Sequence, residues 1–224
     1  MSTGGIVQNW AQASNITLTK NQYNQLAAYQ ALVLETNKSL NLTAITHPED
    51  FAVKHFIDSL TLLPLLPTGA FSLLDIGTGA GFPGIVLKIA RPDIELTLLD
   101  SLRKRIFFLQ NTLTKLNLNG TTLHARAEDL PRLFPATKYD LCTARAVAKL
   151  DKLCKYALPL LKPGGTFLAM KGPNSQQEAT EAQPAITKYG GKIQHIQTTE
   201  IAPGLKHSVV IIRTPVPAPE ELQR

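Results

Sequence analysis

A glycine-rich segment, residues 73–84, constrains the fold of this chain more than any other part of its sequence. An apolar run ends there in Asp75, four glycines follow, and an apolar helical pattern resumes at Ile85. This pattern predicts a buried strand, a tight turn and the beginning of a helix. Glycine tolerates positive φ and lets a ligand approach the backbone, and the N–H groups of a helix N-terminus attract electron-rich groups. We therefore expect a nucleotide-like ligand at this turn.

The same residues match two cofactor motifs. Residues 79–84 match the dinucleotide fingerprint G-x-G-x-x-G. Asp75, Gly77, Gly79 and Gly81 also form the acidic loop D-x-G-x-G-x-G of S-adenosylmethionine-dependent methyltransferases. A carboxylate at the mouth of the loop would repel a pyrophosphate, whereas it would attract the ammonium group of S-adenosylmethionine. The loop therefore favours S-adenosylmethionine.

The length and composition suit one α/β domain with a helical extension. A chain of 224 residues can bury a sizeable core, and 44% hydrophobic with 18% charged residues is typical of globular proteins. The formal charge of +6 modestly favours a polyanionic partner. We find no signal-peptide pattern and no apolar run long enough to span a bilayer, and therefore expect a cytoplasmic protein that does not contact the membrane.

The two cysteines, Cys142 and Cys154, lie in apolar segments and form no C-x-x-C pair. They are predicted to be buried, reduced thiols rather than parts of a disulfide framework or a zinc site. The sequence contains no metal-ligand cluster, P-loop or Ser/His/Asp triad, so we expect no metal. His55 and Asp58 lie on one face of a predicted helix, where a structural hydrogen-bonded pair is a more frequent arrangement than a catalytic one.

We divide the chain into three parts. Residues 1–69 should form a helical extension packed on the sheet, with a loosely held or short helical start, one helix after a capping box at 19–22, and a second helix from Pro48. Residues 70–214 should form the methyltransferase domain. Residues 215–224, which are rich in proline, are predicted to be disordered.

From Phe71 onward, apolar segments alternate with helical patterns as in βαβ units. This alternation predicts five strands, at residues 72–75, 95–100, 121–125, 139–143 and 166–170. Right-handed crossovers would make them a parallel sheet with helices on both faces. Two last strands, 192–201 and 206–213, are joined by a short connection and should form an antiparallel hairpin.

A Rossmann-like sheet of five parallel strands, followed by an antiparallel hairpin and preceded by N-terminal helices, is the arrangement expected of class I S-adenosylmethionine-dependent methyltransferases. A dinucleotide-binding domain more often continues with a parallel sixth strand. The hairpin is independent of the glycine-rich loop, and both features favour the same cofactor.

In an open α/β sheet the ligand binds at the carboxyl ends of the strands. Asp75 ends the first predicted strand, and Asp100 ends the second, where an acid can accept hydrogen bonds from ribose hydroxyls. Ser101 can cap the next helix with its hydroxyl group. Glu128 or Asp129, after the third strand, can receive the adenine amino group, and the pattern alone does not distinguish them.

Several cations follow these strands. Arg145 comes after the fourth strand and should face the reacting end of the cofactor. Arg103, Lys104 and Arg105 begin the helix after the second strand, where they oppose the helix macrodipole unless an anion compensates. We expect these three residues, together with Lys171 after the fifth strand, to contact RNA. A solvated helix face explains the three-residue run equally well.

With these residues placed, the sequence resembles the bacterial glucose-inhibited division protein B family, the guanine-N7 methyltransferases of small-subunit rRNA. The resemblance covers about residues 41–172 and includes Gly-Phe-Pro-Gly at 81–84 followed by Leu-Asp-Ser at 99–101. That combination is much more specific than a glycine motif alone. The segments that carry the resemblance are residues 41–43, 55–59, 75–84, 99–101, 104–105, 127–128, 144–146 and 171–172.

The resemblance implies that S-adenosylmethionine is the cofactor and that it contacts Gly77, Phe82, Ala127, Glu128 and Arg145. It implies as substrate a guanine in the decoding-region loop of 16S rRNA, within the small ribosomal subunit, and 7-methylguanosine as product. Guanine N7 has a free lone pair in the ring plane, so no general base is required and we assign no catalytic residue. We expect the protein to be a monomer.

The complete set of predicted cofactor-binding residues is Asp75, Gly77, Gly79, Gly81, Phe82, Asp100, Ser101, Ala127, Glu128 and Arg145. Two alternative functions stay open at this point. An NAD-dependent oxidoreductase would use the overlapping glycine fingerprint. A catalytically silent RNA-binding factor of ribosome assembly would retain the fold without the activity.

Overall fold

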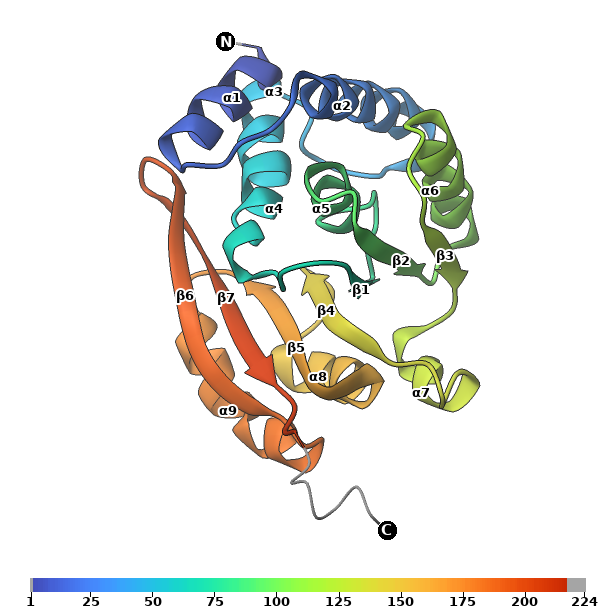
Figure 1. Ribbon diagram of the computed structural model, residues 1–224, viewed down its shortest axis with the longest axis vertical. Coiled ribbons are helices and arrows are strands. Elements are labelled where there is room, and N and C mark those ends of the chain that lie inside the picture. Colours follow the sequence, from blue (N-terminus) through green and yellow to red (C-terminus); the bar gives the residue numbers. More distant parts are fainter. Residues whose placement is uncertain (1, 217–224) are drawn as a thin grey trace.

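A seven-stranded mixed sheet forms the centre of the computed structural model, which describes residues 2–216 (Figure 1). Its strand order is β3-β2-β1-β4-β5-β7-β6. The pairs from β3 to β5 are parallel, whereas β7 is antiparallel to both β5 and β6, so the predicted sheet is confirmed. The strands are β1 Phe71–Ile76, β2 Ile94–Asp100, β3 Thr121–His124, β4 Tyr139–Arg145, β5 Leu161–Lys171, β6 Lys192–Ala202 and β7 Leu205–Arg213.

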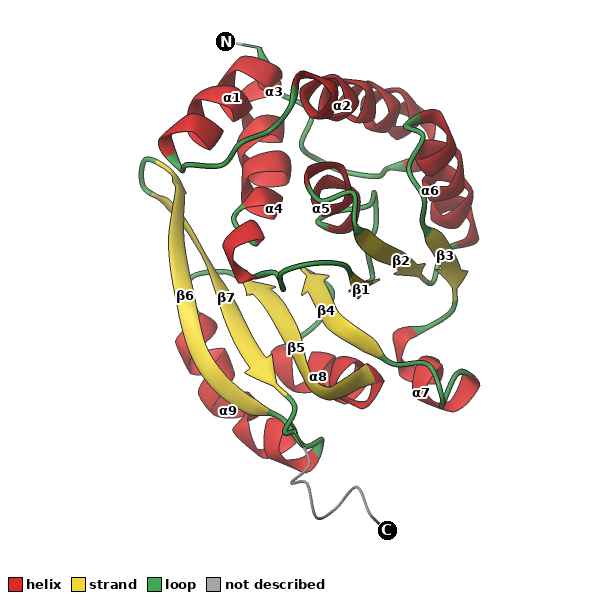
Figure 2. Ribbon diagram, in the orientation of Figure 1, coloured by secondary structure: helices red, strands yellow, loops and turns green. Residues whose placement is uncertain are grey.

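Helices cover both faces of the sheet (Figure 2). Successive residues of a strand point to opposite faces, so Leu73 of β1 packs into one core and Leu74 into the other. The first core also contains the N-terminal helices, α5 (Gly84–Ala90) and α6 (Arg103–Lys115). The second contains residues of α7 (Leu130–Leu133), α8 (Leu150–Ala157) and α9 (Ser175–Lys188).

The N-terminal extension packs directly against the glycine-rich loop. It contains α1 (Thr3–Ala13), α2 (Lys20–Leu40), α3 (Pro48–Phe51), a π-helix (Ala52–Ile57) and α4 (Asp58–Leu60). The predicted capping box at the start of α2 is present. The hydroxyl group of Tyr29, which is fully buried, donates a hydrogen bond to the carbonyl oxygen of Ala80 at 2.6 Å. The extension therefore helps to fix the loop on which the cofactor prediction depends.

Of the two forms expected for the start of the chain, loosely held or a short helix, the structure has the helix: α1 forms because Ser2 caps it and Val7 and Ala11 bury their side chains in the core. One strand differs from the sequence prediction. Strand β5 begins at Leu161 instead of residue 166, since Leu161 pairs with Tyr139 before a shift in register. The predicted strand is thus the second part of a longer, irregular one.

The predicted disordered tail, residues 215–224, lies outside the described residues from position 217 onward. Cys142 and Cys154 are buried free thiols, as predicted. Burial raises the pKa of Cys154 to about 12. Within residues 2–216, no helix is long and apolar enough to cross a bilayer, and no cluster of three or more His, Cys, Asp and Glu side chains could hold a metal ion.

Candidate active site

Asp75, at the end of β1, holds the glycine-rich loop closed from within. Its Oδ2 atom accepts hydrogen bonds from the Thr78 hydroxyl group at 2.5 Å and from the backbone N–H of Gly84 at 2.9 Å. The side chain is completely buried, which raises its pKa to about 6 although both hydrogen bonds lower it. Asp75 therefore does not stand at an open mouth of the loop, which is where the sequence pattern placed it.

The other carboxylate oxygen of Asp75, Oδ1, is buried and has no hydrogen-bond partner among the described residues. Buried polar atoms are normally paired, so an orphaned acceptor is a feature that a ligand can explain. An ammonium group is a suitable partner for it. This observation fits the amino acid moiety of S-adenosylmethionine.

Three glycines give the loop its shape, with positive φ angles at Gly77 (64°), Gly79 (61°) and Gly81 (103°). A Cβ atom at Gly79 would meet no heavy atom within 4 Å, so the backbone there is open to a ligand. A Cβ atom at Gly77 would lie 2.7 Å from Cγ2 of Val147, in the segment after β4. Glycine is required at Gly79 because of the backbone conformation. At Gly77 it is required for the same reason and also because Val147 packs too close for a Cβ atom.

Asp100, at the end of β2, joins the loop to the neighbouring turn. One carboxylate oxygen accepts from the backbone N–H of Gly79 at 3.0 Å, and the other accepts from the N–H of Leu102 at 2.9 Å. The prediction that Ser101 caps the following helix is wrong: the N-cap residue of α6 is Leu102, without a side-chain cap, and Ser101 is exposed. The Asp100 carboxylate bonds instead to the backbone N–H of the N-cap residue itself.

A hollow of about 130 Å³ lies at the carboxyl ends of β1, β2 and β3, and we call it the first hollow. Its lining brings together predicted residues that follow three strands and adds five that were not predicted to bind the cofactor, among them Val147 and Tyr156 from beyond β4. The lining residues are Gly77, Leu99, Asp100, Ser101, Ala125, Arg126, Ala127, Glu128, Val147 and Tyr156. A larger hollow, about 590 Å³, lies at the other ends of β1 and β2 and contains none of the predicted residues.

The first hollow also separates the two acids that the sequence pattern could not distinguish. Glu128 lines it and is exposed. Asp129 does not line it, and its carboxylate lies 3.7 Å from the guanidinium group of Arg132. The geometry therefore favours Glu128 as the acid that faces a ligand in this hollow.

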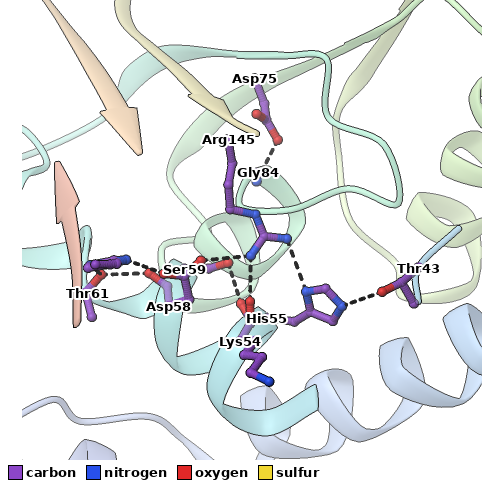
Figure 3. Close-up of polar contacts among 10 residues, drawn as sticks. Thr43, Lys54, His55, Asp58, Ser59, Thr61, Asp75, Gly84 and Arg145 are labelled. Atoms are coloured by element: carbon purple, nitrogen blue, oxygen red, sulfur yellow. Dashed lines mark hydrogen bonds and ion pairs between the residues drawn. The ribbon is translucent and has the colours of Figure 1, made fainter. Parts of the chain in front are cut away.

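Arg145, the last residue of β4, lies outside the first hollow at the centre of a polar network (Figure 3). Its Nη1 atom donates to the Asp58 carboxylate at 2.9 Å and to the carbonyl oxygen of Lys54 at 2.8 Å. Its Nη2 atom donates to Nδ1 of His55 at 3.2 Å. The guanidinium carbon lies 5.2 Å from the ring centroid of Phe82, on which the His55 ring is also stacked at 4.3 Å. Phe82 and Arg145, which were both predicted to contact the cofactor, are thus brought together in a mostly buried cluster.

These hydrogen bonds show that His55 is neutral. A guanidinium group can only donate, so Nδ1 of His55 accepts from Arg145 and Nε2 carries the proton toward the Thr43 hydroxyl group, 2.9 Å away. Burial and the positive charge of Arg145 lower the pKa of His55 to about 3. His55 and Asp58 are joined through Arg145, to which each is bonded, instead of by the direct hydrogen bond that the sequence pattern favoured.

His207, from β7, holds the other side of Asp58. Its Nδ1 atom bonds to Asp58 Oδ1, and its Nε2 atom lies 3.0 Å from the Thr61 hydroxyl oxygen. That hydroxyl group also donates to the carbonyl oxygen of Asp58 at 2.7 Å. Burial alone would raise the pKa of Asp58, but the hydrogen bond from His207 and the charge of Arg145 lower it. Asp58 is therefore a carboxylate held between two donors.

A π-helix at Ala52–Ile57 supplies this network, and no apolar pattern in these residues predicted it. Such segments are rare and are often found at functional sites, because the wider turn re-aims carbonyl groups and side chains. Here Lys54 and His55, both within the π-helix, contact Arg145. The role of His207 was also missed, since 149 residues separate it from Asp58.

The predicted RNA contacts fall into two groups. Arg103 and Lys104 are exposed at the start of α6, and Arg105 is half-buried with its guanidinium group 3.4 Å from the Asp100 carboxylate. Lys171 does not fit the prediction. Its ammonium group is bonded to Glu178 at 2.9 Å and to the carbonyl oxygen of Ala148 at 2.7 Å, with only 10% of the side chain exposed.

Comparisons with known proteins agree with this geometry. The model of the GidB family, described as rRNA small subunit methyltransferase G, matches residues 22–207. A ribosomal RNA small subunit methyltransferase G from Clostridium botulinum is 46% identical over 93% of this chain and 89% of its own length. A protein of the same description from Pelotomaculum thermopropionicum is 43% identical over 97% of this chain and 93% of its own length. A methyltransferase structure from Pyrococcus furiosus, 14% identical, has a TM-score of 0.58 and covers 88% of this chain and all of its own, which shows the shared fold.

A pair of glycine substitutions tests the loop. Gly79→Ala and Gly204→Ala both place a Cβ atom in open space at positive φ, 61° and 74°, so their costs in stability should be similar, about 1–2 kcal/mol. Only Gly79→Ala should weaken binding of S-adenosylmethionine, since Gly204 lies in the distant β6–β7 turn. Calorimetric titration measures both affinities. Equal cofactor affinity in the two variants would contradict the placement of the cofactor at this loop.

Acid should destabilise the protein through His55. Its folded pKa of about 3 lies below the ordinary 6.5, so between these values the unfolded chain binds a proton that the folded protein does not. The contribution of His55 to the free energy of unfolding is therefore fully present above pH 6.5. Well below that pH it falls by about 1.4 kcal/mol per pH unit. Asp75, with its pKa raised to about 6, has the opposite slope, and Asp58 stays ionised.

The contribution of His55 is isolated by a variant. Urea unfolding of His55→Gln between pH 7.5 and 5 should show a smaller loss of stability on acidification than wild type, because glutamine keeps an acceptor for Arg145 but cannot be protonated. His195→Gln, which changes an exposed histidine on β6, is the control. An unchanged slope in His55→Gln would show that His55 is not buried as a neutral group.

Proposed function

Because this chain belongs to the rRNA small subunit methyltransferase G family, we propose that the atom it methylates is N7 of a guanine, in the decoding-region loop of 16S rRNA. The chain is an rRNA methyltransferase with the class I fold, and S-adenosylmethionine is its methyl donor. The family match favours neither an oxidoreductase nor a silent assembly factor.

The main support for the N7 assignment is that both histidines near Arg145 are already hydrogen-bonded within the protein. His55 accepts from Arg145 and donates to Thr43, and the two nitrogens of His207 are hydrogen-bonded to Asp58 and Thr61, so each ring nitrogen already has a partner within the protein. Methylation at guanine N7 needs no such base. The N7 lone pair forms a bond to the methyl carbon as the carbon–sulfur bond breaks, and no proton is transferred.

Different residues at the strand ends would bind different parts of the methyl donor. Gly77, Asp100 and Ala127 would enclose the adenosine portion in the first hollow, with Glu128 near the adenine amino group. The unpaired Oδ1 atom of Asp75 would receive the ammonium group. When bound, S-adenosylmethionine supplies an electrophilic methyl group on a sulfonium centre. The Arg145 network lies beside this position and keeps it rigid.

Catalysis would then come mainly from positioning. Holding the base and the methyl carbon in line can lower a barrier by on the order of 7–11 kcal/mol. The acceptor base must leave its stack to present N7, which costs least in a single-stranded loop. A rigid set of buried contacts around Arg145, including the stacked rings of His55 and Phe82, suits this task.

An RNA-binding surface continues from the active site along α6. Arg103 and Lys104 project from its first turn, and Phe107, one turn further on the same helix face, is 61% exposed. Cations neutralise phosphates, and exposed aromatic rings stack on bases of single strands. Arg105 contributes less, because it is oriented toward Asp100, and Lys171 is not part of this surface, because it is paired with Glu178.

We also propose that the protein acts as a monomer on the small ribosomal subunit in the cytoplasm. The residues of the Arg145 network and of the first hollow all come from one chain, so a second copy is not needed to complete them.

Transfer of labelled methyl groups tests the acceptor assignment. The enzyme is incubated with labelled S-adenosylmethionine and either unmodified small subunits or naked 16S rRNA, and the RNA is digested to nucleosides. The expected product is labelled 7-methylguanosine, and the comparison of substrates shows which assembly state is required. Label in a different nucleoside would refute the N7 assignment and leave the family intact.

The salt dependence of RNA binding tests the surface on α6. Each phosphate contact to a single strand contributes about 0.7 to the slope of log affinity against log salt. The double variant Arg103→Ala/Lys104→Ala should therefore reduce that slope by about 1.4. Lys152→Ala/Lys155→Ala removes two exposed cations of α8, on the opposite face of the sheet, and should leave it unchanged. Equal slopes in the two variants would place the RNA elsewhere.

A further inference from the structure

A second hollow, of about 220 Å³, adjoins the first across the segment that follows β4, and we call it the acceptor hollow. It is lined by Asp58, Arg145, Ala146, Met170, Lys171, Gly172 and His207. Val147, the next residue after Ala146, lines the first hollow. The segment between the two hollows includes Ala146, whose φ of 55° is unusual for a residue with a side chain and is typical of functional sites.

We propose that the acceptor hollow receives the guanine base, and that the Asp58 carboxylate recognises it by accepting hydrogen bonds from its N1–H and N2–H₂ groups. This inference rests on the proposed function, because that function makes guanine the acceptor. It assigns a substrate-recognition role to a residue of the N-terminal extension and a positioning role to His207 of the C-terminal hairpin.

The position of the hollow in the sheet supports this assignment. The strand order reverses between β1 and β4, and ligands of open α/β sheets bind at such a point. The first hollow lies at the ends of β1, β2 and β3, on one side of this point. The acceptor hollow lies at the ends of β4 and β5 and beside β7, on the other side. A methyl donor in the first hollow and a base in the acceptor hollow would therefore meet at the point where the strand order reverses.

The size of the acceptor hollow suits a single base. Pockets that enclose ligands of drug size measure about 300–1,000 Å³. At about 220 Å³ the acceptor hollow is smaller, which fits a flipped base whose ribose and phosphate remain outside. Met170 supplies an apolar wall, and the charged side chains supply the polar ones.

The chemistry of Asp58 selects guanine over adenine. Each carboxylate oxygen accepts one hydrogen bond from the protein, Oδ2 from Arg145 and Oδ1 from His207, so each retains a lone pair. Guanine offers donors at N1 and N2, whereas adenine has an acceptor at N1, which a carboxylate repels. N7 lies on the opposite edge of the purine. Recognition by Asp58 therefore leaves the reacting atom free.

The surroundings of Asp58 keep it in the form that this recognition needs. Arg145 and His207 hold both oxygens from opposite sides, and Ser59, the next residue, is tied to the His55 carbonyl oxygen at 2.6 Å. The π-helix that ends at Ile57 places Asp58 at this point. With 11% of its side chain exposed, the carboxylate is mostly buried but can be reached from the hollow.

Inosine tests the contact, because it lacks only the N2 amino group of guanosine. Small subunits are assembled with 16S rRNA that carries inosine at the methylated position, and kcat/KM is compared with that of the guanosine form. Losing one hydrogen bond to a charged acceptor should lower kcat/KM of wild type about 10- to 100-fold. In Asp58→Asn the inosine penalty should shrink to about threefold or less, because the charged acceptor is gone.

Controls separate recognition from folding. Asp151→Asn changes an exposed acid on α8 and should keep the full inosine penalty. Asp58→Asn and a second variant, His207→Gln, are checked by thermal unfolding and by their affinity for S-adenosylmethionine, and their kcat/KM values are measured with the variants folded and saturated with cofactor. His207→Gln should raise KM for the subunit and reduce the inosine penalty, since Asp58 loses one of its two fixed donors.

The outcomes distinguish this inference from the function on which it rests. A full inosine penalty in both Asp58→Asn and His207→Gln would overturn the role of Asp58, while 7-methylguanosine formation by wild type would keep the proposed function. Failure of wild type to label guanine N7 would overturn the proposed function instead.

Discussion

The ion pair between Arg145 and Asp58 is the interaction on which the rest of this site depends. It joins the end of β4 to the N-terminal extension across 87 residues of sequence, with a contact of 2.9 Å and both side chains mostly buried. Removing one partner of a buried pair generally costs about 3–5 kcal/mol, because the other charge is left uncompensated. Further hydrogen bonds stabilise the buried pair: the Lys54 carbonyl oxygen and His55 accept from Arg145, and His207 bonds to Asp58.

Two histidines on this pair have opposite hydrogen-bonding roles. His55 faces the guanidinium group and must accept, so burial and the adjacent cation keep it neutral. His207 faces the carboxylate, and its two nitrogens bond to Asp58 and Thr61. The same side chain is thus used once as an acceptor for a cation and once as a donor to an anion. Together the two histidines fix both charged groups.

A similar division appears in the glycine-rich loop. Asp75 and Asp100 were expected to hold the cofactor directly, and the structure shows that both first hold the loop, through the N–H groups of Gly84 and Gly79. Tyr29 holds it from the N-terminal extension. A loop fixed at three points before the ligand binds loses little entropy on binding, which is what precise placement of a methyl group requires.

Local patterns in the sequence were enough to predict the sheet, its antiparallel hairpin and the glycine-rich turn, because alternating apolar residues, glycine spacing and short connections specify them. The same patterns placed Glu128 and Arg145 at strand ends. The choice between Glu128 and Asp129, the pairing of Lys171 with Glu178 and the approach of His207 to Asp58 became visible in the folded chain alone. These three outcomes depend on contacts between side chains and on a π-helix, and neither leaves a periodic signal in the sequence.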